Sequence, residues 1–530
     1  MFRYAASPLR SPALPRSPRT RIRPLRASLL TAAYAPAPLL APLLFAPLLL
    51  LGGCTASLAS AAAVSGPTPI SSPAPPPNPL SLTPASATIQ AWQTLQFTLT
   101  GADNPTGCIW STSSSSVLSS LDGGQFQGQQ VGSATVSVAC GTLAAQAAVT
   151  VIPQVVSGPI VISSGGTYSG NWNSDDPATP AVTIATGDPV TIEDSFITSR
   201  GTLIHILGAA AGAHVTIENV TATALDPGVE GLQRGAFVSA TNIVALVVRN
   251  CTVTGVSFGV YAAGSTVSTL QVLNNLALNL EDRSSDGQGG LLAARPDPGH
   301  FVILGRVVAP EGAEIGWNKV VQTMGQSSVE DVINIFRTQG APGAPVWVHD
   351  NYIEGNSSPS APNNYTGAGI IADGGSAAPV TAFALFENND VVHTAGSGVV
   401  IANGHDVIAT GNRIVSCGQD ASGTWFAMTY ANAASIWDGY NSGPALFFNN
   451  TVTATAGGLV RPNAEDNPMA ADFWGSPLSM TYPGNSASGN DFTNPCLVNG
   501  TLNLAAEDAE RAFWAAKVAA AGELIGDQHE

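Results

Sequence analysis

The sequence predicts an all-β protein whose central part is a parallel β-solenoid, a stack of coils in which each coil adds one strand to each face. Three observations support this prediction. Short strands rich in β-branched residues recur down most of the chain, and an asparagine recurs at the same point between two of them. The intervals between these asparagines are irregular, and the shortest, from Asn389 to Asn412, matches one three-strand coil with longer loops inserted elsewhere.

The recurring asparagine stands between two apolar strands, as in LVVRNCTVT around Asn250 and VWVHDNYI around Asn351. Each coil needs a polar residue at its turn to satisfy backbone groups, and asparagine side chains stacked along the axis can hydrogen-bond to one another. We expect Asp194 to open this column and Asn490 to close it. The asparagines between them are Asn219, Asn250, Asn275, Asn318, Asn351, Asn389, Asn412 and Asn450.

A second column of strands precedes the asparagine strands and supports the same register. Examples are FGVYAAG, GAGIIADGG and GSGVVIANG, which are short, rich in β-branched residues and bounded by glycine or polar turns. Adjacent coils are expected ~4.8 Å apart, as neighbouring strands are. About ten coils would therefore form a rod roughly 50 Å long within residues 155–500.

Residues 1–53 are not expected to belong to the fold. Residues 1–26 carry seven arginines and no acidic residue, and residues 27–53 are apolar, contain prolines and, together with Cys54, end in LLLLGGC. This is the pattern of a signal peptide, and the prolines argue against a stable transmembrane helix. The end of this stretch resembles the lipobox of bacterial lipoproteins, which implies that Cys54 is lipidated; the alternative is an ordinary secretory signal.

Residues 54–80 are rich in Ala, Ser and Pro, and they predict an extended tether without a core. Removal of the seven N-terminal arginines leaves 12 basic and 36 acidic residues, a net charge of −24. Such a surface repels nucleic acid and anionic lipid, so the lipid anchor is the only membrane contact that we expect. The sequence thus predicts an exported, monomeric lipoprotein of the bacterial outer membrane or cell surface, better suited to a neutral glycan than to a polyanionic one.

Residues 81–153 predict a separate small β unit, because short alternating strands with turn signals are typical of a sandwich. The stretches QTLQF, WSTS and GSATV within it resemble the bacterial Ig-like domains of group 2. The resemblance implies a spacer, an adhesion module or a weak glycan contact. Cys108 lies just before Trp110 and Cys140 lies on a late strand, so in an exported protein we expect a disulfide between them; the alternative is two buried thiols.

Three further cysteines, Cys251, Cys417 and Cys496, leave at least one thiol unpaired. They are expected to act as small buried apolar residues, and their spacing resembles no zinc site. The end of the chain, residues 501–530, changes character. Its Ala-rich stretch has apolar residues at helical spacing around Trp514, which predicts an amphipathic helix that covers the last coil or lies along the solenoid.

The asparagine phrases, together with GGTYSGNW at residues 165–172, resemble the right-handed parallel β-helix proteins of the pectate-lyase-like superfamily. The resemblance covers roughly two thirds of the chain. It implies the fold class of the whole protein: all-β, with a right-handed parallel β-helix preceded by a small Ig-like sandwich and followed by a C-terminal helix. The superfamily holds polysaccharide lyases, glycoside hydrolases, epimerases, esterases, adhesins and tailspikes, so the resemblance alone selects no activity.

Enzymes of this superfamily place their reacting groups on one long face, where successive coils stack their side chains. Residues of one column on consecutive coils lie about 5 Å or 10 Å apart, so polar and aromatic groups late in the second column can act together. The candidate catalytic residues are Arg337, Asp373, His393, Asp406 and Asp438, and the candidate substrate-binding residues are Asp331, Asn334, Trp437, Tyr440 and Arg461.

Two chemistries suit these residues. Carboxylates from neighbouring coils can serve as the acid and base of a glycoside hydrolase. Alternatively, Arg337 or His393 can abstract the C5 proton of a uronate while acidic residues hold Ca²⁺ against its carboxylate, as polysaccharide lyases do. Calcium is therefore the one cofactor that the sequence brings into consideration, and a polysaccharide is the expected partner.

Each candidate also has a structural interpretation. Asp373, Asp406 and Asp438 suit ordinary solenoid turns, and His393 suits a structural position beside a glycine turn. Arg337 suits a salt bridge to a neighbouring acidic residue. The aromatic candidates suit packing beneath a long loop as well as stacking on a sugar.

Familiar signatures of named activities do not occur. The sequence contains no clustered aspartate pair with a downstream Gly-His-Gly, no phosphate loop and no nucleophile elbow. Two functions follow: an anchored lyase or hydrolase that acts on a polysaccharide, and a non-catalytic adhesin or glycan-binding protein. The insertions at 276–317, 354–366 and 418–434 favour the enzyme, because loops that wall one face form a cleft.

Overall fold

The computed structural model describes residues 79–528, apart from 92, 102–106, 122, 153–154, 208–211, 324, 356–366, 421, 427–430 and 462–470. The expected signal peptide, the lipidation site Cys54 and nearly all of the tether lie outside this part of the chain. Within the described ranges, no helix is long and apolar enough to cross a membrane.

The first described unit contains two principal sheets that share one core. One sheet has the strand order β2-β9-β8-β5, the other has the order β3-β7-β6, and β1 pairs with β4. Leu118, Phe126 and Val136 are fully buried in the shared core. A disulfide joins Cys108 to Cys140. The strands are β1 (Ser81–Thr83), β2 (Ser86–Gln90), β3 (Thr94–Gln96), β4 (Thr98–Thr100), β5 (Ile109–Thr112), β6 (Leu118–Ser120), β7 (Gln125–Gly128), β8 (Gly132–Cys140) and β9 (Leu143–Ile152).

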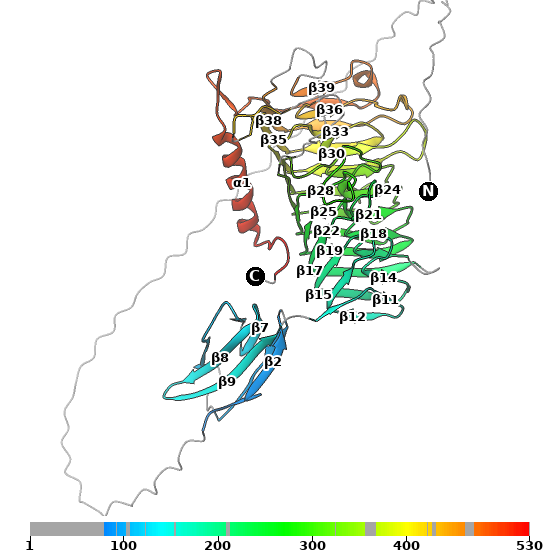
Figure 1. Ribbon diagram of the computed structural model, residues 1–530. Coiled ribbons are helices and arrows are strands. Elements are labelled where there is room, and N and C mark those ends of the chain that lie inside the picture. Colours follow the sequence, from blue (N-terminus) through cyan, green and yellow to red (C-terminus); the bar gives the residue numbers. More distant parts are fainter. Residues whose placement is uncertain are drawn as a thin grey trace, which may run out of the picture. The chain divides into compact units, whose positions relative to one another are not determined.

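The following strands form a parallel β-helix, which Figure 1 shows as a tall stack of arrows. Strands of neighbouring coils pair in parallel and make two continuous sheets. We call the sheet of 20 strands the long sheet and the sheet of 11 strands the short sheet. The predicted class, an all-β solenoid followed by a C-terminal helix, is confirmed.

The strands of the long sheet make up two of the faces of each coil. They are β10 (Val156–Ser157), β12 (Gly166–Tyr168), β13 (Asn171–Ser174), β15 (Val190–Ser199), β17 (Ala213–Ala224), β19 (Ile243–Arg249), β20 (Thr252–Thr254), β22 (Thr269–Leu273), β23 (Leu276–Leu278), β25 (Ala313–Gly316), β26 (Lys319–Val321), β28 (Val346–His349), β29 (Tyr352–Glu354), β31 (Ala382–Glu387), β32 (Asp390–Val392), β34 (His405–Thr410), β35 (Arg413–Ser416), β37 (Thr451–Thr453), β38 (Ala456–Leu459) and β40 (Ser486–Ser488).

The short sheet supplies the remaining face. Its strands are β11 (Ile160–Ile162), β14 (Val182–Ile184), β16 (Ile204–Ile206), β18 (Val238–Thr241), β21 (Phe258–Ala263), β24 (His300–Gly305), β27 (Ile333–Phe336), β30 (Ala368–Asp373), β33 (Ser397–Ile401), β36 (Ala434–Ile436) and β39 (Phe473–Gly475). The short 3-10 helix η3 (Ser479–Thr481) and the hairpin of β41 (Leu497–Val498) and β42 (Thr501–Leu502) follow the last of these strands.

Alternation along the short sheet separates the core from the outer surface. Val238, Val260 and Val302 follow one another in register and are buried in the solenoid core. The residue after each of them points outward, and these positions form a continuous line that we call the outer row. Its members are Val161, Thr183, His205, Ser239, Tyr261, Ile303, Asn334, Ile371, Val400, Ser435 and Trp474.

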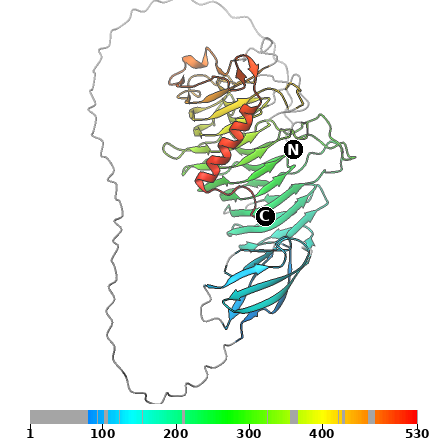
Figure 2. The same cartoon turned by 90° about the vertical axis from the view of Figure 1, so that its left-hand side faces the viewer.

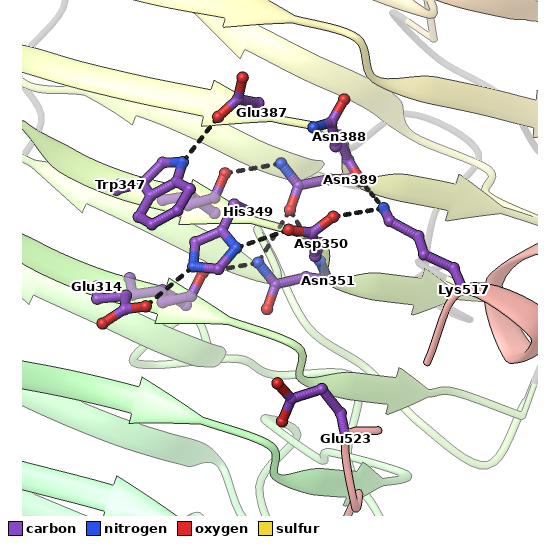
Figure 3. Close-up of polar contacts among 12 residues, drawn as sticks. Glu314, Trp347, His349, Asp350, Asn351, Glu387, Asn388, Asn389, Lys517 and Glu523 are labelled. Atoms are coloured by element: carbon purple, nitrogen blue, oxygen red, sulfur yellow. Dashed lines mark hydrogen bonds and ion pairs between the residues drawn. The ribbon is translucent and has the colours of Figure 1, made fainter. Parts of the chain in front are cut away.

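A buried asparagine ladder runs along the turn within the long sheet, as the sequence predicts. The side-chain amide of each member donates to the side-chain carbonyl of the next at 2.9–3.0 Å. The same carbonyl also accepts a backbone N–H from the coil before it, so each asparagine satisfies backbone groups that would otherwise be buried without partners. Figure 3 shows the contact between two members. The ladder consists of Asn275, Asn318, Asn351, Asn389 and Asn412.

The expected ladder is wrong in its first three coils. Asp194, Asn219 and Asn250 have left-handed backbone, with φ of 45°, 54° and 51°, and each stands one residue before the column. Cys251 takes the ladder position in its coil, because its backbone N–H donates to the side chain of Asn275. Asparagine tolerates the left-handed region better than most residues do, which explains its recurrence at this preceding position too.

The expected ladder is also wrong at its far end. Asn450 lies before β37, at another corner, where its side chain binds the backbone of the preceding coil. Thr455 stands in the column instead, and its backbone N–H donates to Asn490. Asn490 therefore occupies the position in the last coil at which the sequence predicts the column to close.

One α-helix is described, α1 (Ala505–Ala521), and it lies along the flank of the β-helix, as both Figure 1 and Figure 2 show. Of the two positions expected for it, the structure thus shows the second. The indole N–H of Trp514 donates to the backbone carbonyl of Asp350 at 2.9 Å. Lys517 reaches the carboxylate of Asp350 at 2.6 Å, a contact visible in Figure 3. Gly522 ends the helix with a φ of 75°.

The chain beyond α1 continues along the same flank. Asn274 donates to Glu523 at 2.6 Å, and Asn250 donates to the backbone carbonyl of Leu524 at 2.7 Å. The side chain of Asn219 accepts the backbone N–H of Gln528 at 2.6 Å. The left-handed asparagines of the early coils thus bind the C-terminal tail.

A second disulfide joins Cys417 to Cys496, which corrects the expectation that these residues are buried thiols. The bond links the end of β35 to the segment that leads into β41. Cys496 lies far along the chain but folds back beside Cys417, which local sequence spacing does not reveal. Cys251 is a buried free thiol, as expected.

Candidate functional site

Three adjoining cavities form one groove over the outer face of the short sheet. Their volumes are about 560, 680 and 650 Å³. Glu330 lines all three, and Asp373 lines the first two. Tyr261 and His300 line the second and third. We call the three together the groove, and its first part, which is the most enclosed, the inner cavity.

Asp373 is the best-held carboxylate of the inner cavity. It is the final residue of β30, where the chain turns outward from the sheet. One of its oxygens accepts the hydroxyl of Tyr440 and, at 2.8 Å, the backbone N–H of Gly374. The other accepts the side-chain amide of Asn334 at 3.1 Å. Three donors therefore fix the orientation of this carboxylate toward the cavity.

Glu330 faces the same cavity in a different environment. Burial raises the pKa of its carboxyl group above the usual value of 4.5. Arg295 opposes this shift, while the charges of Asp373 and Asp282 add to it. Arg295 is itself bound by Asp282, at 2.6 Å. The inner cavity thus holds one carboxyl group that stays protonated to higher pH beside one that is surrounded by hydrogen-bond donors.

His300 lines the middle of the groove and is 4% exposed. Burial lowers its pKa to about 4, although the backbone carbonyl of Asp331 opposes the shift. That carbonyl lies 2.7 Å from Nδ1 and can only accept, so Nδ1 carries the proton. The Nε2 atom of this neutral ring is consequently a hydrogen-bond acceptor.

Apolar side chains form the floor of the inner cavity. Ile371, Val400 and Ala402 lie side by side on β30 and β33 or directly after them, and Trp437 packs against them. The Trp437 ring meets the ring of Trp474 edge to face, with centroids 5.7 Å apart. The inner cavity thus combines an apolar floor with a few hydrogen-bonding groups, the usual composition of a small-molecule site.

Five of the residues predicted for the site come together in this region. Asp373, Trp437 and Tyr440 line the inner cavity. Asp331 lines it too, but its carboxylate is tied to Asn334 at 3.0 Å and to the backbone N–H of Ala368 at 2.8 Å. Asn334 lines the middle of the groove. Asp331 therefore holds the two strands β27 and β30 in place and is poorly placed to react.

His393 and Arg461 do not reach the groove. The Nδ1 atom of His393 lies 2.7 Å from the carboxylate of Glu507, so this histidine docks α1 on the opposite flank. Arg461 binds Asp472 at 2.8 Å and the backbone carbonyl of Ala431 at 2.6 Å. Both side chains therefore hold segments of the fold together.

Asp438 has a turn position, which agrees with its structural interpretation, whereas Asp406 lies within a strand. Asp406 lies on β34 of the long sheet, has a φ of 55° and binds His405 at 2.7 Å. Asp438 caps its own turn, accepting the backbone N–H groups of Ser442 and Gly443 at 2.8 and 2.7 Å. Neither lines any part of the groove.

Arg337 follows β27 and forms no ion pair with any described residue. Its guanidinium carbon lies 5.4 Å from the centre of the Phe336 ring, and the group covers Gly375, where a side chain would leave it no room. The salt bridge to Glu330 or Asp331 considered from the sequence is not formed. The side chain lies beside the groove and does not line it.

Among the described residues, no three carboxylates converge closely enough to share one ion. Only one group of three possible ligands converges closely in this part of the chain, namely Cys417, Cys496 and Glu507. Its two sulfur atoms are bonded to each other, and Glu507 binds His393.

A second polar cluster lies on the long sheet, outside the groove (Figure 3). Burial acts to lower the pKa of His349, but hydrogen bonds to Asp350 and Glu314 outweigh it and raise that pKa. The ring stacks on Trp347 with centroids 3.6 Å apart, and the indole N–H of Trp347 donates to Glu387. Both ring nitrogens of His349 are engaged, so it is poorly placed for proton transfer.

Comparisons with known proteins assign this chain to no family. No family model matches the sequence, and no curated protein is significantly similar to it. The chemistry of the groove residues therefore carries the functional argument.

Several residues of the groove were not among the predicted site residues. Glu330 precedes Asp331 in the sequence and could have been selected as the second carboxyl group of that coil. Tyr261 and Ser435 occupy the outer row, which becomes recognisable only when the coils are in register. His300 begins β24 and Asn432 lies two residues before β36, both after long insertions, where sequence spacing no longer gives the register.

Proposed function

We propose that this protein is a glycoside hydrolase that binds a polysaccharide in the groove over the short sheet. The observation that carries the proposal is the pair Glu330 and Asp373, two carboxyl groups of one cavity with contrasting environments. Hydrolysis of a glycosidic bond needs one carboxyl group that donates a proton and one carboxylate that accepts a proton or attacks.

In the proposed reaction, Glu330 donates its proton to the oxygen of the leaving sugar as the glycosidic bond breaks. Asp373 acts on the anomeric carbon, either by taking a proton from the incoming water or by direct attack followed by hydrolysis. Tyr440, Asn334 and the Gly374 N–H hold Asp373 in orientation. The apolar floor and Trp437 support the sugar ring beside these groups.

Elimination from a uronate is the second candidate, and one observation favours it. His300 is neutral and has an acceptor nitrogen in the groove, so it could take a proton from a sugar carbon. The basic residues predicted for this chemistry, Arg337 and His393, do not line the groove. We therefore rank hydrolysis first.

The cellular setting is also a proposal. Lipidation at Cys54 would anchor the exported protein at the bacterial cell surface or outer membrane. The Pro-rich tether and the small β unit, with its resemblance to Ig-like domains, would act as a spacer between the membrane and the β-helix. A net charge of −24 for the mature chain fits contact with neutral polysaccharide and not with nucleic acid.

The test uses the mature protein, residues 55–530, with a panel of neutral and uronic-acid polysaccharides. New reducing ends and the ultraviolet absorbance of unsaturated uronates are measured together. Hydrolysis predicts reducing ends without absorbance. Glu330→Gln and Asp373→Asn should each lower kcat by about 100-fold or more, and activity should fall as pH rises through the pKa of Glu330.

Asp406→Asn is the matched control, because Asp406 lies on the long sheet and should leave kcat unchanged. If the wild type produces ultraviolet absorbance and His300→Gln does not, the reaction is elimination and the hydrolase proposal is wrong. Binding of a polysaccharide without any bond cleavage would support a non-catalytic adhesin or glycan-binding protein instead.

A further inference from the structure

Two buried polar side chains of the inner cavity have hydrogen-bonding atoms without partners. Asn432 and Ser435 are each 1% exposed and both line this cavity. Among the described residues, no group donates to the Asn432 side-chain carbonyl, and none bonds to the Ser435 hydroxyl. A buried polar atom without a partner costs free energy, so its retention beside a cavity points to a partner supplied by a ligand.

Their position in the fold directs these atoms into the cavity. Ser435 is the middle residue of β36 and belongs to the outer row, next to Val400 of the apolar floor. The backbone carbonyl of Asn432 accepts the N–H of Gly398 at 2.9 Å, which fixes Asn432 at the edge of that strand. Both residues therefore lie beyond the apolar floor, on the coil that follows Val400.

We propose that Asn432 and Ser435 form a subsite that hydrogen-bonds the hydroxyl groups of a neutral sugar ring and excludes uronic acids. This subsite deepens the proposed hydrolase function and rests on it, because it would hold the ring adjacent to the bond that Glu330 and Asp373 cleave.

The chemistry of the lining groups explains why the subsite would prefer a neutral sugar to a uronic acid. The Asn432 carbonyl oxygen can only accept a hydrogen bond, and the Ser435 hydroxyl can donate or accept. A sugar hydroxyl can satisfy both, whereas a uronate carboxylate has no proton to donate to Asn432. The same cavity holds the carboxyl groups of Glu330, Asp331 and Asp373, and no lysine or arginine lines it among the described residues. A further anion in this space would be repelled by these carboxylates and would meet no cation among the lining residues.

The proposal makes an unusual prediction about stability. Truncation of a residue that stabilises the fold lowers the melting temperature. Asn432 and Ser435 instead destabilise the folded protein, because their polar atoms are buried without partners. Ser435→Ala and Asn432→Leu should therefore leave the melting temperature unchanged or raise it. At the same time each should lower kcat/KM on a neutral polysaccharide by roughly 10-fold or more, because a sugar hydroxyl loses its partner.

Ser416→Ala is the matched control. Ser416 is fully buried, and its hydroxyl donates to the backbone carbonyl of Thr394 at 2.7 Å, away from the groove. This variant should lose stability and keep kcat/KM, the opposite of the result expected for Ser435→Ala.

The substrates are matched pairs of neutral and acidic polymers: galactan with polygalacturonate, mannan with mannuronan, and β-glucan with glucuronan. We expect cleavage of a neutral member and at least ~10-fold slower cleavage of its acidic counterpart. Equal or faster cleavage of a polyuronate would overturn the subsite and leave the hydrolase proposal intact. Wild-type kcat/KM in both Ser435→Ala and Asn432→Leu would also overturn it.

If no polymer is cleaved, the hydrolase proposal fails. Affinity electrophoresis in gels that contain the same polymers then tests separately whether the subsite binds a neutral sugar. Retardation by a neutral polymer that is lost in Ser435→Ala supports the subsite as a binding site. Absence of retardation by every neutral polymer overturns it as well.

Discussion

At the scale of single residues, Asp390 lies beneath α1 with a carboxyl group that accepts no hydrogen bond from any described residue. It is completely buried, and the nearest cationic atoms, on Arg413 and Lys517, are 3.8 and 3.9 Å away. Burial raises the pKa of Asp390 to about 7; the two cations lower it in part, and Glu510 and Asp350 raise it further. The fold thus tolerates this residue better as a neutral acid than as an anion.

Replacement of Asp390 by asparagine should stabilise the protein at neutral pH. The pKa of Asp390 is higher in the folded chain than its ordinary value of 3.8, so its contribution to stability is fully present below pH 4 and is lost as pH rises toward 7. We expect Asp390→Asn to unfold like the wild type at pH 4 and to gain about 4 kcal/mol in free energy of unfolding at pH 8. Urea unfolding of both proteins at pH 4 and at pH 8 measures the difference in free energy of unfolding.

The exposed Asp175 offers a control substitution of the same kind. A gain in Asp390→Asn that is equal at pH 4 and pH 8 would contradict the explanation, because it would not follow the titration of the buried carboxyl group.

The candidate site could be predicted from sequence only where its residues share the outer face of the short sheet. Asp373, Trp437 and Tyr440 end or follow strands of that sheet, and they meet in the inner cavity. His393 has the same kind of sequence neighbourhood, but its strand, β32, belongs to the long sheet. Sequence patterns show that a residue follows a strand, whereas the face that it joins depends on the register of the coils.

At the scale of elements, α1 joins coils that are distant in sequence. Trp514 is 4% exposed and packs on Tyr352, with ring centroids 5.2 Å apart. Arg413 of β35 binds Glu510 in α1 through two hydrogen bonds, at 2.6 and 2.7 Å. The apolar spacing around Trp514 predicts this helix, but the acidic residues that bind the flank are recognisable only when their partners are known.

Truncation of Trp514 should release α1 without unfolding the coils. Trp514→Ala removes a buried ring and a hydrogen bond, a loss of about 3–5 kcal/mol that acts on the docking of one element. We expect trypsin to cleave after Arg511 and Lys517 much faster in this variant. Phe513→Ala is the neighbouring control, because Phe513 is 47% exposed.

Mass spectrometry of the digestion products identifies the sites and rates of cleavage. Cleavage inside the β-helix at the same rate as in α1 would contradict independent release of the helix.

The asparagine column shows how much of an element sequence can predict. Five consecutive coils carry the ladder where the sequence predicts it, because each buried turn needs the same amide. The early asparagines Asn219 and Asn250 were assigned to it incorrectly, since a left-handed turn position and a ladder position favour the same residue type. Their side chains bind the C-terminal tail, a contact between residues too distant in sequence to infer.

At the scale of the whole molecule, the groove follows the stack of coils. From Ser239 on β18 to Ser435 on β36, the outer row crosses seven strands of the short sheet, a length of about 30 Å at the spacing of neighbouring strands. A groove of this length lies along the axis and offers contacts to more than one sugar of a linear chain. The solenoid architecture therefore favours polymeric substrates over small ones.

A substitution of Tyr261 tests this conclusion, because Tyr261 lines the second and third cavities of the groove and not the inner cavity. In a hydrolase of the proposed kind, Tyr261→Ala should lower kcat/KM on long chains by about 10-fold and have little effect on the shortest cleavable oligosaccharide, because it removes a remote contact. Kinetics against a series of chain lengths measure the difference.

Trp347→Ala, on the long sheet, is the control and should leave kcat/KM unchanged on both long chains and short oligosaccharides. An equal loss of activity for Tyr261→Ala on short and long substrates would contradict an extended binding groove.

The docking of α1 has a consequence for the order in which the protein is made. Every coil leaves the ribosome before residues 505–521, so the growing solenoid is stacked while its flank is still open. Glu507, which accepts hydrogen bonds from His393 and from the Cys417 N–H, reaches them only after all of these coils exist. A chain interrupted before this point would keep that flank accessible to proteases, and the helix thereby distinguishes finished molecules from unfinished ones.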